Sequence, residues 1–177
     1  MINTSKLKLT LLQQDILRLL FTKTGVKLNQ REIANFLKVS PPAVMKALPN
    51  LNNFIKISKD KRWSIELNRS EHKVMQLKRA DNLKQIYESG LADFLENKFP
   101  GATIILFGSY SRGEDLINSD IDIAVIGRKD KLIDLGKYEK ELERQINIHF
   151  YDSFTKIHKN LKENLCNGIL LTGGIEL

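Results

Sequence analysis

A strand-like run that ends in a glycine–serine pair, followed closely by two aspartates, constrains this chain more than any other feature. The run Thr103–Phe107 consists of β-branched, aliphatic and aromatic residues, which is typical of a buried strand, and Gly108-Ser109 follows it at once. After ten further residues, 120–126 form a second such run, with aspartate at its first and third positions. The pattern predicts two neighbouring strands joined by a short polar connection.

The two aspartates of the second run indicate a metal site. Side chains alternate along a strand, so Asp120 and Asp122 share one face while Ile121 lies on the other. Two neighbouring carboxylates on a buried strand repel each other and lose hydration unless a cation lies between them. Oxygen ligands of this kind suit Mg²⁺, which commonly binds together with substrate phosphates. Gly108 would let the backbone approach such phosphates, and Ser109 would offer its N–H and hydroxyl at a helix start.

The order of strand, glycine–serine pair, ten-residue gap and Asp-x-Asp resembles the DNA polymerase β-like nucleotidyltransferase superfamily, in particular its minimal nucleotidyltransferases. The resemblance covers about residues 100–177 and implies a small domain with a mixed sheet. It implies that Asp120 and Asp122 are catalytic metal ligands and that Gly108, Ser109 and Arg112 bind the nucleotide. The implied cofactor is Mg²⁺, as one or two ions, and the implied substrate is an NTP, with ATP expected. A solvated Asp-x-Asp at a strand edge is the structural alternative.

The next strand lacks an acid that the family places there. In the family, a third carboxylate on a later strand helps to hold the metal that activates the attacking hydroxyl. Here that strand is 146–151, and its positions on the expected face are Asn147 and His149, while Asp152 lies out of phase. Asn147 carries no charge and cannot take up a proton at neutral pH. These two residues are the candidate third-ligand positions, and nucleotide binding with slow or absent transfer stays open.

The first part of the chain has the pattern of three helices and a hairpin. An N-capping signal precedes each predicted helix: Thr10 with Gln13, Asn29 with Glu32, and Ser40 before Pro41. Residues 54–57 and 63–67 then alternate as two strands around a polar turn. This order resembles a winged helix-turn-helix domain, in which the third helix would enter the major groove of duplex DNA.

The charge of this first part is compatible with a polyanionic partner and equally with lysines that only keep helix surfaces solvated. Up to Lys98 the sequence has eighteen Lys and Arg against nine Asp and Glu, and from Phe99 onward it has ten against twelve. The predicted DNA-contacting residues are Lys46, Lys59, Lys61 and Arg62. Pro49, however, should end or kink the third helix, whose outward side chains offer few groups that read bases. A protein-contact or dimer role is therefore the alternative.

The 177 residues suffice for two small domains. A helical stretch begins at Ser70, is interrupted at Gly90 and ends at Pro100. We therefore predict a two-domain chain of the α+β class: a winged helix-turn-helix at 1–69, a connecting helix at 70–99 and a nucleotidyltransferase-like domain at 100–177. In the last of these we expect a helix near 132–144, a helix over 153–167 with Cys166 in the core, and a closing strand at 168–171.

The sequence predicts a cytoplasmic protein. Its apolar runs are too short to span a bilayer, its N-terminus has no secretory pattern, and its single cysteine cannot form an internal disulfide. The leading functional hypothesis is a Mg²⁺-dependent nucleotidyltransferase that moves a nucleoside monophosphate from an NTP to a hydroxyl group. The alternative is a DNA-binding regulator whose second domain binds nucleotide with weak or no transfer. The resemblance also implies a helical partner protein, and a homodimer would fit the dimer role of winged helices.

Overall fold

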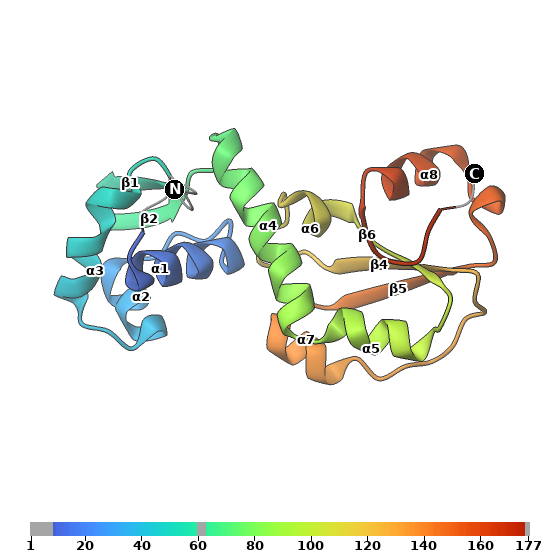
Figure 1. Cartoon of the computed structure of the whole chain (residues 1–177). Helices are drawn as coiled ribbons and strands as arrows, with labels where there is room; N and C mark the ends of the chain where they lie inside the picture. The colour runs from blue at the N-terminus through green and yellow to red at the C-terminus, as the bar shows by residue number, and fades with distance from the viewer. Residues whose placement is uncertain (1–8, 60–62, 176–177) are drawn as a thin grey trace, which may run out of the picture. The chain divides into compact units, whose positions relative to one another are not determined.

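The computed structural model of the protein describes residues 9–59 and 63–175. The chain divides into two compact units, Met1–Val74 and Met75–Leu177. The division falls within one helix, α4 (His72–Glu88), and the domain boundaries expected from the sequence at 69 and 99 stay a prediction (Figure 1). None of the helices in the described ranges has the length and apolar character needed to cross a membrane.

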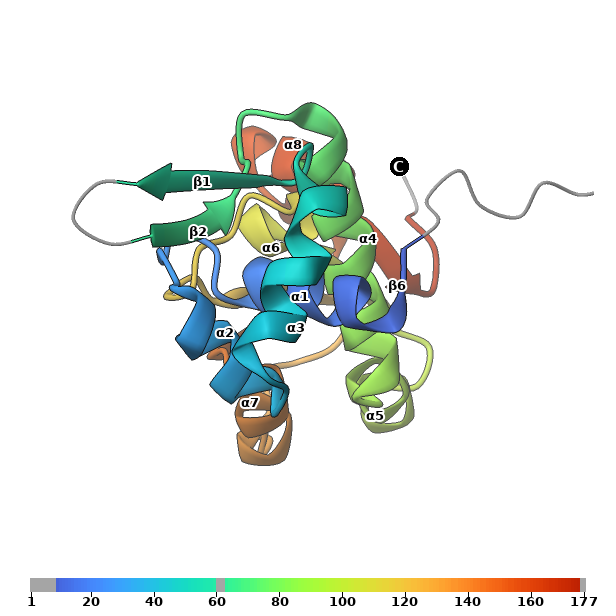
Figure 2. The same ribbon diagram turned by 90° about the vertical axis from the view of Figure 1, so that its left-hand side faces the viewer.

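The first unit has the element order predicted for a winged helix-turn-helix domain (Figure 2). It contains α1 (Leu11–Thr22), α2 (Gln30–Leu37), α3 (Pro41–Ala47), the 3₁₀ turn η1 (Leu48–Leu51) and the antiparallel strands β1 (Ile55–Lys59) and β2 (Trp63–Leu67). The predicted caps are confirmed, because the side chains of Thr10, Asn29 and Ser40 accept backbone N–H groups of the following helices. The α-helical part of the third helix stops at Ala47, two residues before Pro49, as predicted from the missing N–H of proline.

The second unit is built on a four-stranded sheet in the order β5-β4-β3-β6. After α4 its elements are α5 (Leu91–Lys98), β3 (Thr103–Phe107), α6 (Gly108–Arg112), β4 (Ile121–Ile126), α7 (Gly136–Leu142), β5 (Ile146–Tyr151), the 3₁₀ turn η2 (Phe154–Lys156), α8 (Lys159–Cys166) and β6 (Ile169–Thr172). Strands β4 and β5 are parallel, whereas β3 is antiparallel to both β4 and β6. The predicted mixed sheet is therefore confirmed.

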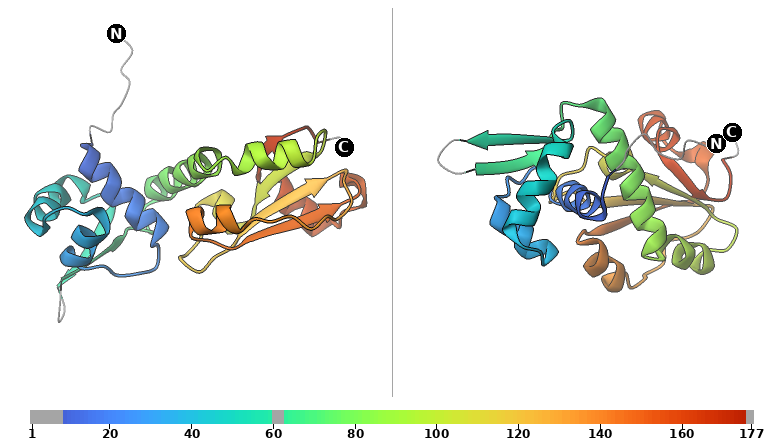
Figure 3. Two further views of the ribbon diagram at one scale, coloured as in Figure 1. Left: turned by 90° about the horizontal axis from the view of Figure 1, so that it is seen from below. Right: turned by 60° about the vertical axis from the view of Figure 1, so that its left-hand side comes forward.

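Helices cover both faces of this sheet, with α8 on one side and α5 and α7 on the other (Figure 1, Figure 3). The face toward α5 and α7 carries the fully buried Ile104, Leu106, Ile121 and Ile123. The opposite face packs against η2, α8 and the residues between them. The sheet contributes Ile105, Phe107, Ala124 and Ile126, and the covering segment contributes Phe154, Ile157 and Leu165. Alternation along β4 places Asp122 on this second face. Asp122 lies near the start of the strand and is half-buried.

Two predicted helices and the predicted position of one side chain differ from the structure. The helix expected over 153–167 is split into η2 and α8, because Ile157 is extended (φ −76°, ψ 141°) and packs into the core. Cys166 is exposed and its predicted core position is wrong, since the neighbouring Leu165 takes the inward position at 1% exposure. The helix expected near 132–144 is shorter, at Gly136–Leu142. Gly90 interrupts the long helical stretch as predicted, with φ +75° between α4 and α5.

Candidate functional site

Gly108 lies where β3 turns directly into α6, against the carboxylate of Asp122. Its φ of +76° is in the left-handed region that favours glycine. A Cβ atom at this position would lie only 2.6 Å from Asp122 Oδ2. Both the backbone conformation and the close approach of the carboxylate therefore require glycine here. Ser109 follows as the second residue of the helix and is half-buried.

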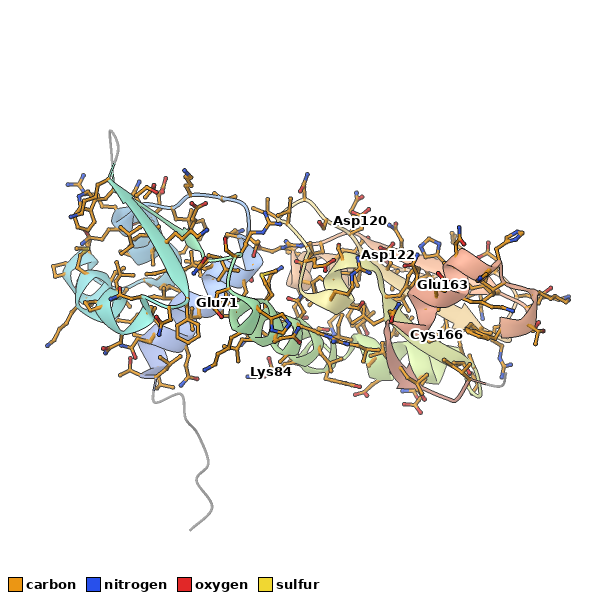
Figure 4. All side chains as sticks on the ribbon, turned by 90° about the horizontal axis from the view of Figure 1, so that it is seen from above. Glu71, Lys84, Asp120, Asp122, Glu163 and Cys166 are labelled. Atoms are coloured by element: carbon orange, nitrogen blue, oxygen red, sulfur yellow. The ribbon has the colours of Figure 1, made fainter. Side chains whose placement is uncertain are left out.

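Asp120 and Asp122 lie at the start of β4, which forms one edge of the site (Figure 4). In the sheet Asp122 lies opposite Phe107, the last residue of β3. The intervening Ile121 is fully buried on the opposite face, as alternation predicts, while both acids are half-buried. The strand thus presents two carboxylates beside the turn at Gly108.

Asn147 and His149 of β5 each face one of these acids. The amide Nδ2 of Asn147 donates to Asp120 Oδ2 at 3.1 Å, and His149 Nε2 lies 3.4 Å from Asp122 Oδ1. The imidazole also contacts the Phe107 ring edge to face, with 5.4 Å between centroids. The two residues that sequence alternation placed toward the acids are therefore nitrogen-bearing neighbours of those acids.

Tyr151 is a further neighbour of Asp122 that the sequence did not single out. Burial, and to a smaller extent the charge of Asp122, raise the pKa of Tyr151. Its phenol is therefore protonated at neutral pH and cannot serve as a base there. Alternation along β5 would have placed it on the face of Asn147 and His149.

Arg112 lies at the end of α6, and its side chain is partly exposed. Its Nε donates to Glu114 Oε2 at 2.8 Å, and the structure records no contact from it to the two aspartates. Because such an exposed pair is weak, the guanidinium can exchange this carboxylate for another anion at little cost.

The donor set of the site fits Mg²⁺ through two protein carboxylates. Among the described residues, no group of three or more His, Cys, Asp and Glu side chains comes together as a metal site. Mg²⁺ nevertheless commonly takes only one or two carboxylates and completes its octahedron with water and substrate phosphates. Asp120 and Asp122, both half-buried beside the turn at Gly108, match that requirement.

The predicted DNA-contacting residues of the first unit lie partly outside the described residues. Lys46 on α3 and Lys59 at the end of β1 are exposed, whereas Lys61 and Arg62 fall in 60–62, which the structure does not describe. Beside them lies a residue that the sequence interpretation missed. Trp63 is 45% exposed, and the Lys59 ammonium lies 4.5 Å from its ring centroid. Lys59 and Trp63 are paired across the hairpin of β1 and β2.

Residues 88–170 match the family model described as "Nucleotidyltransferase domain". The matched range contains α6, β4 and β5, and so all the residues of the site described above. This part of the chain is therefore similar to nucleotidyltransferase domains. The resemblance noted in the sequence is thereby supported at the level of the superfamily, whereas the roles of the individual residues stay predictions.

Among solved structures, the chain is similar to two mutants of ZitR from Lactococcus lactis and to MepR from S. aureus in complex with DNA. The ZitR structures have 30% and 32% sequence identity, TM-scores of 0.41 and 0.37, and cover 54% of this chain and 65% of their own. The MepR structure has 25% identity and a TM-score of 0.36, and covers 51% of this chain and 81% of its own. At such TM-scores these likenesses do not bear on the function of this chain. Comparison with curated proteins gives no match.

Proposed function

We propose that the nucleotidyltransferase-type domain binds Mg²⁺ and an NTP, ATP being the expected one, and transfers the nucleoside monophosphate to a hydroxyl group. The observation that carries this proposal is the position of Gly108, whose missing side chain lets the turn between β3 and α6 lie directly against the carboxylate of Asp122, one of the paired acids. A purely structural Asp-x-Asp at a strand edge would need no glycine turn so close to its carboxylate. The match of residues 88–170 to the nucleotidyltransferase family model supports the same reaction class.

Each site residue has a defined task in this proposal. Asp120 and Asp122 would hold Mg²⁺, which when bound neutralises charge on the triphosphate. The backbone at Gly108 and Ser109 would approach the phosphates, and Arg112 would exchange Glu114 for a phosphate oxygen. In the reaction the acceptor oxygen bonds to the α-phosphorus, the bond to the bridging oxygen breaks, and pyrophosphate leaves. The acceptor proton must go to a base, and a third carboxylate would ordinarily be well placed to take it.

A nucleotide-binding regulator with weak or no transfer is the second candidate. It is favoured by the hydrogen bond from the Asn147 amide to Asp120, since an amide in that place neither takes up a proton nor adds charge for a second metal. Duplex DNA is the proposed partner of the first unit in either case. The exposed Lys46 and Lys59, and the excess of basic residues up to Lys98, support that partner.

Thermal unfolding with and without Mg²⁺ and ATP tests the proposal. At a ligand concentration about a hundred times Kd, we expect Tm to rise by about 5–10 °C. An Asp120→Asn/Asp122→Asn double variant should lose this rise, whereas Asp93→Asn/Asp130→Asn, which removes two exposed charges elsewhere, should keep it. Equal rises in both double variants would refute the site. Incubation with ATP labelled at the α-phosphate, with and without cell extract, then distinguishes the two candidate functions. A nucleotidyltransferase attaches the label to an acceptor, whereas a regulator with weak or no transfer does not.

A further inference from the structure

A buried charged cluster lies beside the candidate site and has no part in the function proposed above. Lys78 of α4 is fully buried, and Asp115, in the loop after α6, is 1% exposed. The Lys78 ammonium donates to the backbone carbonyl of Asp115 at 2.7 Å and to its Oδ1. Asn82, one turn along α4, donates to the same Oδ1 at 2.7 Å and to the carbonyl of Tyr110 at 2.9 Å. Arg144 Nη2 lies 3.7 Å from Asp115 Oδ2. These side chains form the Lys78–Asp115 cluster.

The backbone just after α6 also lies directly against α4. Gly113 has φ +74°, and a Cβ atom there would lie 2.7 Å from the carbonyl oxygen of Met75 and 2.8 Å from the backbone nitrogen of Arg79. No other residue fits this approach without moving one of the two backbones. The segment from α6 onward is thus held on α4 by a backbone contact and by the buried hydrogen bonds of the cluster.

This segment carries the candidate site at both of its ends. It begins with Gly108 and Ser109, and it ends at Asp120, the first of the paired acids. A turn in which Leu116 and Ser119 exchange hydrogen bonds at 2.9 and 3.0 Å connects the middle of the segment to that acid. A displacement of the segment from α4 would therefore move the glycine–serine turn relative to the acids.

Stability alone is a poor explanation for the cluster. Burying an ammonium, a guanidinium and a carboxylate costs hydration free energy, and apolar side chains of similar volume often stabilise a core equally well or better. Directional hydrogen bonds, in contrast, specify one relative position of the elements that they join. The carbonyl of Tyr110 and both acceptor atoms of Asp115 lie on the segment whose position matters for the site.

We propose that Lys78, Asn82 and Asp115 are positioning residues of the nucleotide site. They hold residues 108–120 on α4 and thereby keep the glycine–serine turn and the paired acids at the spacing that a bound triphosphate requires. This inference rests on the proposed function, because positioning has a purpose only where a nucleotide binds.

Asn82→Ala in the full-length chain is the first test, because it removes two hydrogen bonds without leaving a buried charge. We expect the affinity for ATP with Mg²⁺ to fall by about tenfold to a hundredfold, as small displacements of binding groups commonly cause. Amide hydrogen exchange over 108–119 should accelerate. The matched control is Gln85→Ala, which removes an amide bonded at 3.2 Å only to Asp81 within α4 and should change neither quantity.

The triple variant Lys78→Met/Asp115→Leu/Arg144→Met is the second test, because it replaces the charges together and leaves none buried alone. We expect a folded protein with unchanged or higher Tm that has lost the nucleotide-dependent rise in Tm. A purely structural cluster predicts the reverse, namely a retained rise. If the triple variant does not fold, the comparison of Asn82→Ala with Gln85→Ala decides.

The two proposals fail in different ways. A wild-type chain without any nucleotide-dependent rise in Tm refutes the proposed function, and the exchange rates then decide whether the cluster orders 108–119. Unchanged exchange in Asn82→Ala overturns the positioning role. Faster exchange with unchanged nucleotide affinity in a wild type that does bind ATP overturns it as well.

Discussion

At the scale of single residues, the candidate site is defined by which atoms face the two aspartates. Gly108 lets the backbone lie close to Asp122, because any side chain at position 108 would collide with Asp122 Oδ2. Asn147 and His149 contribute nitrogen atoms at 3.1 and 3.4 Å from the two carboxylates. These neighbours reduce the repulsion between the acids in the absence of a cation, and they leave the site without a third carboxylate.

Asn147→Asp should increase nucleotidyl transfer by at least about tenfold, a cautious lower bound on general-base assistance that is worth roughly 10²–10⁴-fold. The new carboxylate replaces a donor to Asp120 by a like charge, so Tm without Mg²⁺ should fall and should recover when Mg²⁺ and ATP are added. Transfer is measured with a promiscuous hydroxyl acceptor, and Asn147→Ala serves as the control that removes the amide without adding charge. A folded aspartate variant with unchanged or lower transfer would contradict this placement.

Gly108→Ala should abolish the nucleotide-dependent rise in Tm, whereas Gly127→Ala should not. Both glycines have positive φ, +76° and +85°, so each substitution costs about 1–2 kcal/mol of backbone strain. Only the Cβ at Gly108 meets the Asp122 carboxylate, since nothing lies within 4 Å of a Cβ at Gly127. Unfolding curves of both variants are measured with and without Mg²⁺ and ATP. They distinguish the effect of backbone strain, which both variants share, from the loss of nucleotide binding, which is expected only in the Gly108 variant. Retention of the rise in the Gly108 variant speaks against the proposed role of this turn.

At the scale of elements, the predicted hairpin of β1 and β2 forms, and it exposes an aromatic side chain that the sequence interpretation did not single out. Its inner residues Ile55, Ile65 and Leu67 are buried, but Ile57 and Trp63, on the same face, are exposed at 38% and 45%. The strands therefore extend past the apolar core and present an aromatic ring next to the exposed Lys59. A basic and aromatic surface of this kind is typical of nucleic-acid contacts.

Duplex DNA should change the fluorescence of Trp63, the only tryptophan of the chain, in a salt-dependent manner. Replacing Lys59, Lys61 and Arg62 by Ala should flatten the plot of log K against log salt by about three phosphate contacts, at roughly 0.9 per contact. Lys129→Ala, an exposed lysine of the second unit, is the control. Fluorescence titration and anisotropy of labelled duplex measure the effect. Absence of binding at low salt would favour the protein-contact alternative.

At the scale of the whole molecule, the chain consists of two compact units. The basic excess lies up to Lys98, and the paired acids lie beyond it. DNA binding and nucleotide binding should therefore be separable by mutation. Both candidate functions, an enzyme that also binds DNA and a DNA-binding regulator that senses nucleotide, require duplex DNA and a nucleotide as ligands.

Duplex DNA should raise Tm equally in the wild type and in Asp120→Asn/Asp122→Asn, because added ligand stabilises any unit that binds it. In the same way, the rise caused by Mg²⁺ and ATP should survive in Lys59→Ala/Lys61→Ala/Arg62→Ala. Calorimetric unfolding of the three proteins, each with either ligand, checks both statements. Loss of both rises in either variant would show that the two activities share one site.

The sequence by itself determined the local features whose signals lie close together in the chain. Capping residues, the stop of α3 before Pro49, the interruption at Gly90 and the run from β3 into Gly108-Ser109 all depend on neighbours within a few positions. Strand alternation likewise placed Asp120 and Asp122 on one face, with Asn147 and His149 toward them.

Only the tertiary structure decided which residues meet across long separations. In the sequence Lys78 is one of several lysines of a polar helix. In the structure it is fully buried, and Asp115, 37 positions away, accepts hydrogen bonds from its ammonium group. Cys166 was expected in the core and is exposed, because whether an apolar face is covered depends on which element packs on it. The clash that excludes a side chain at Gly108 similarly arises from Asp122 on the neighbouring strand. Local preference selects the elements, whereas packing between distant segments determines which of their side chains are buried, paired or left for a ligand.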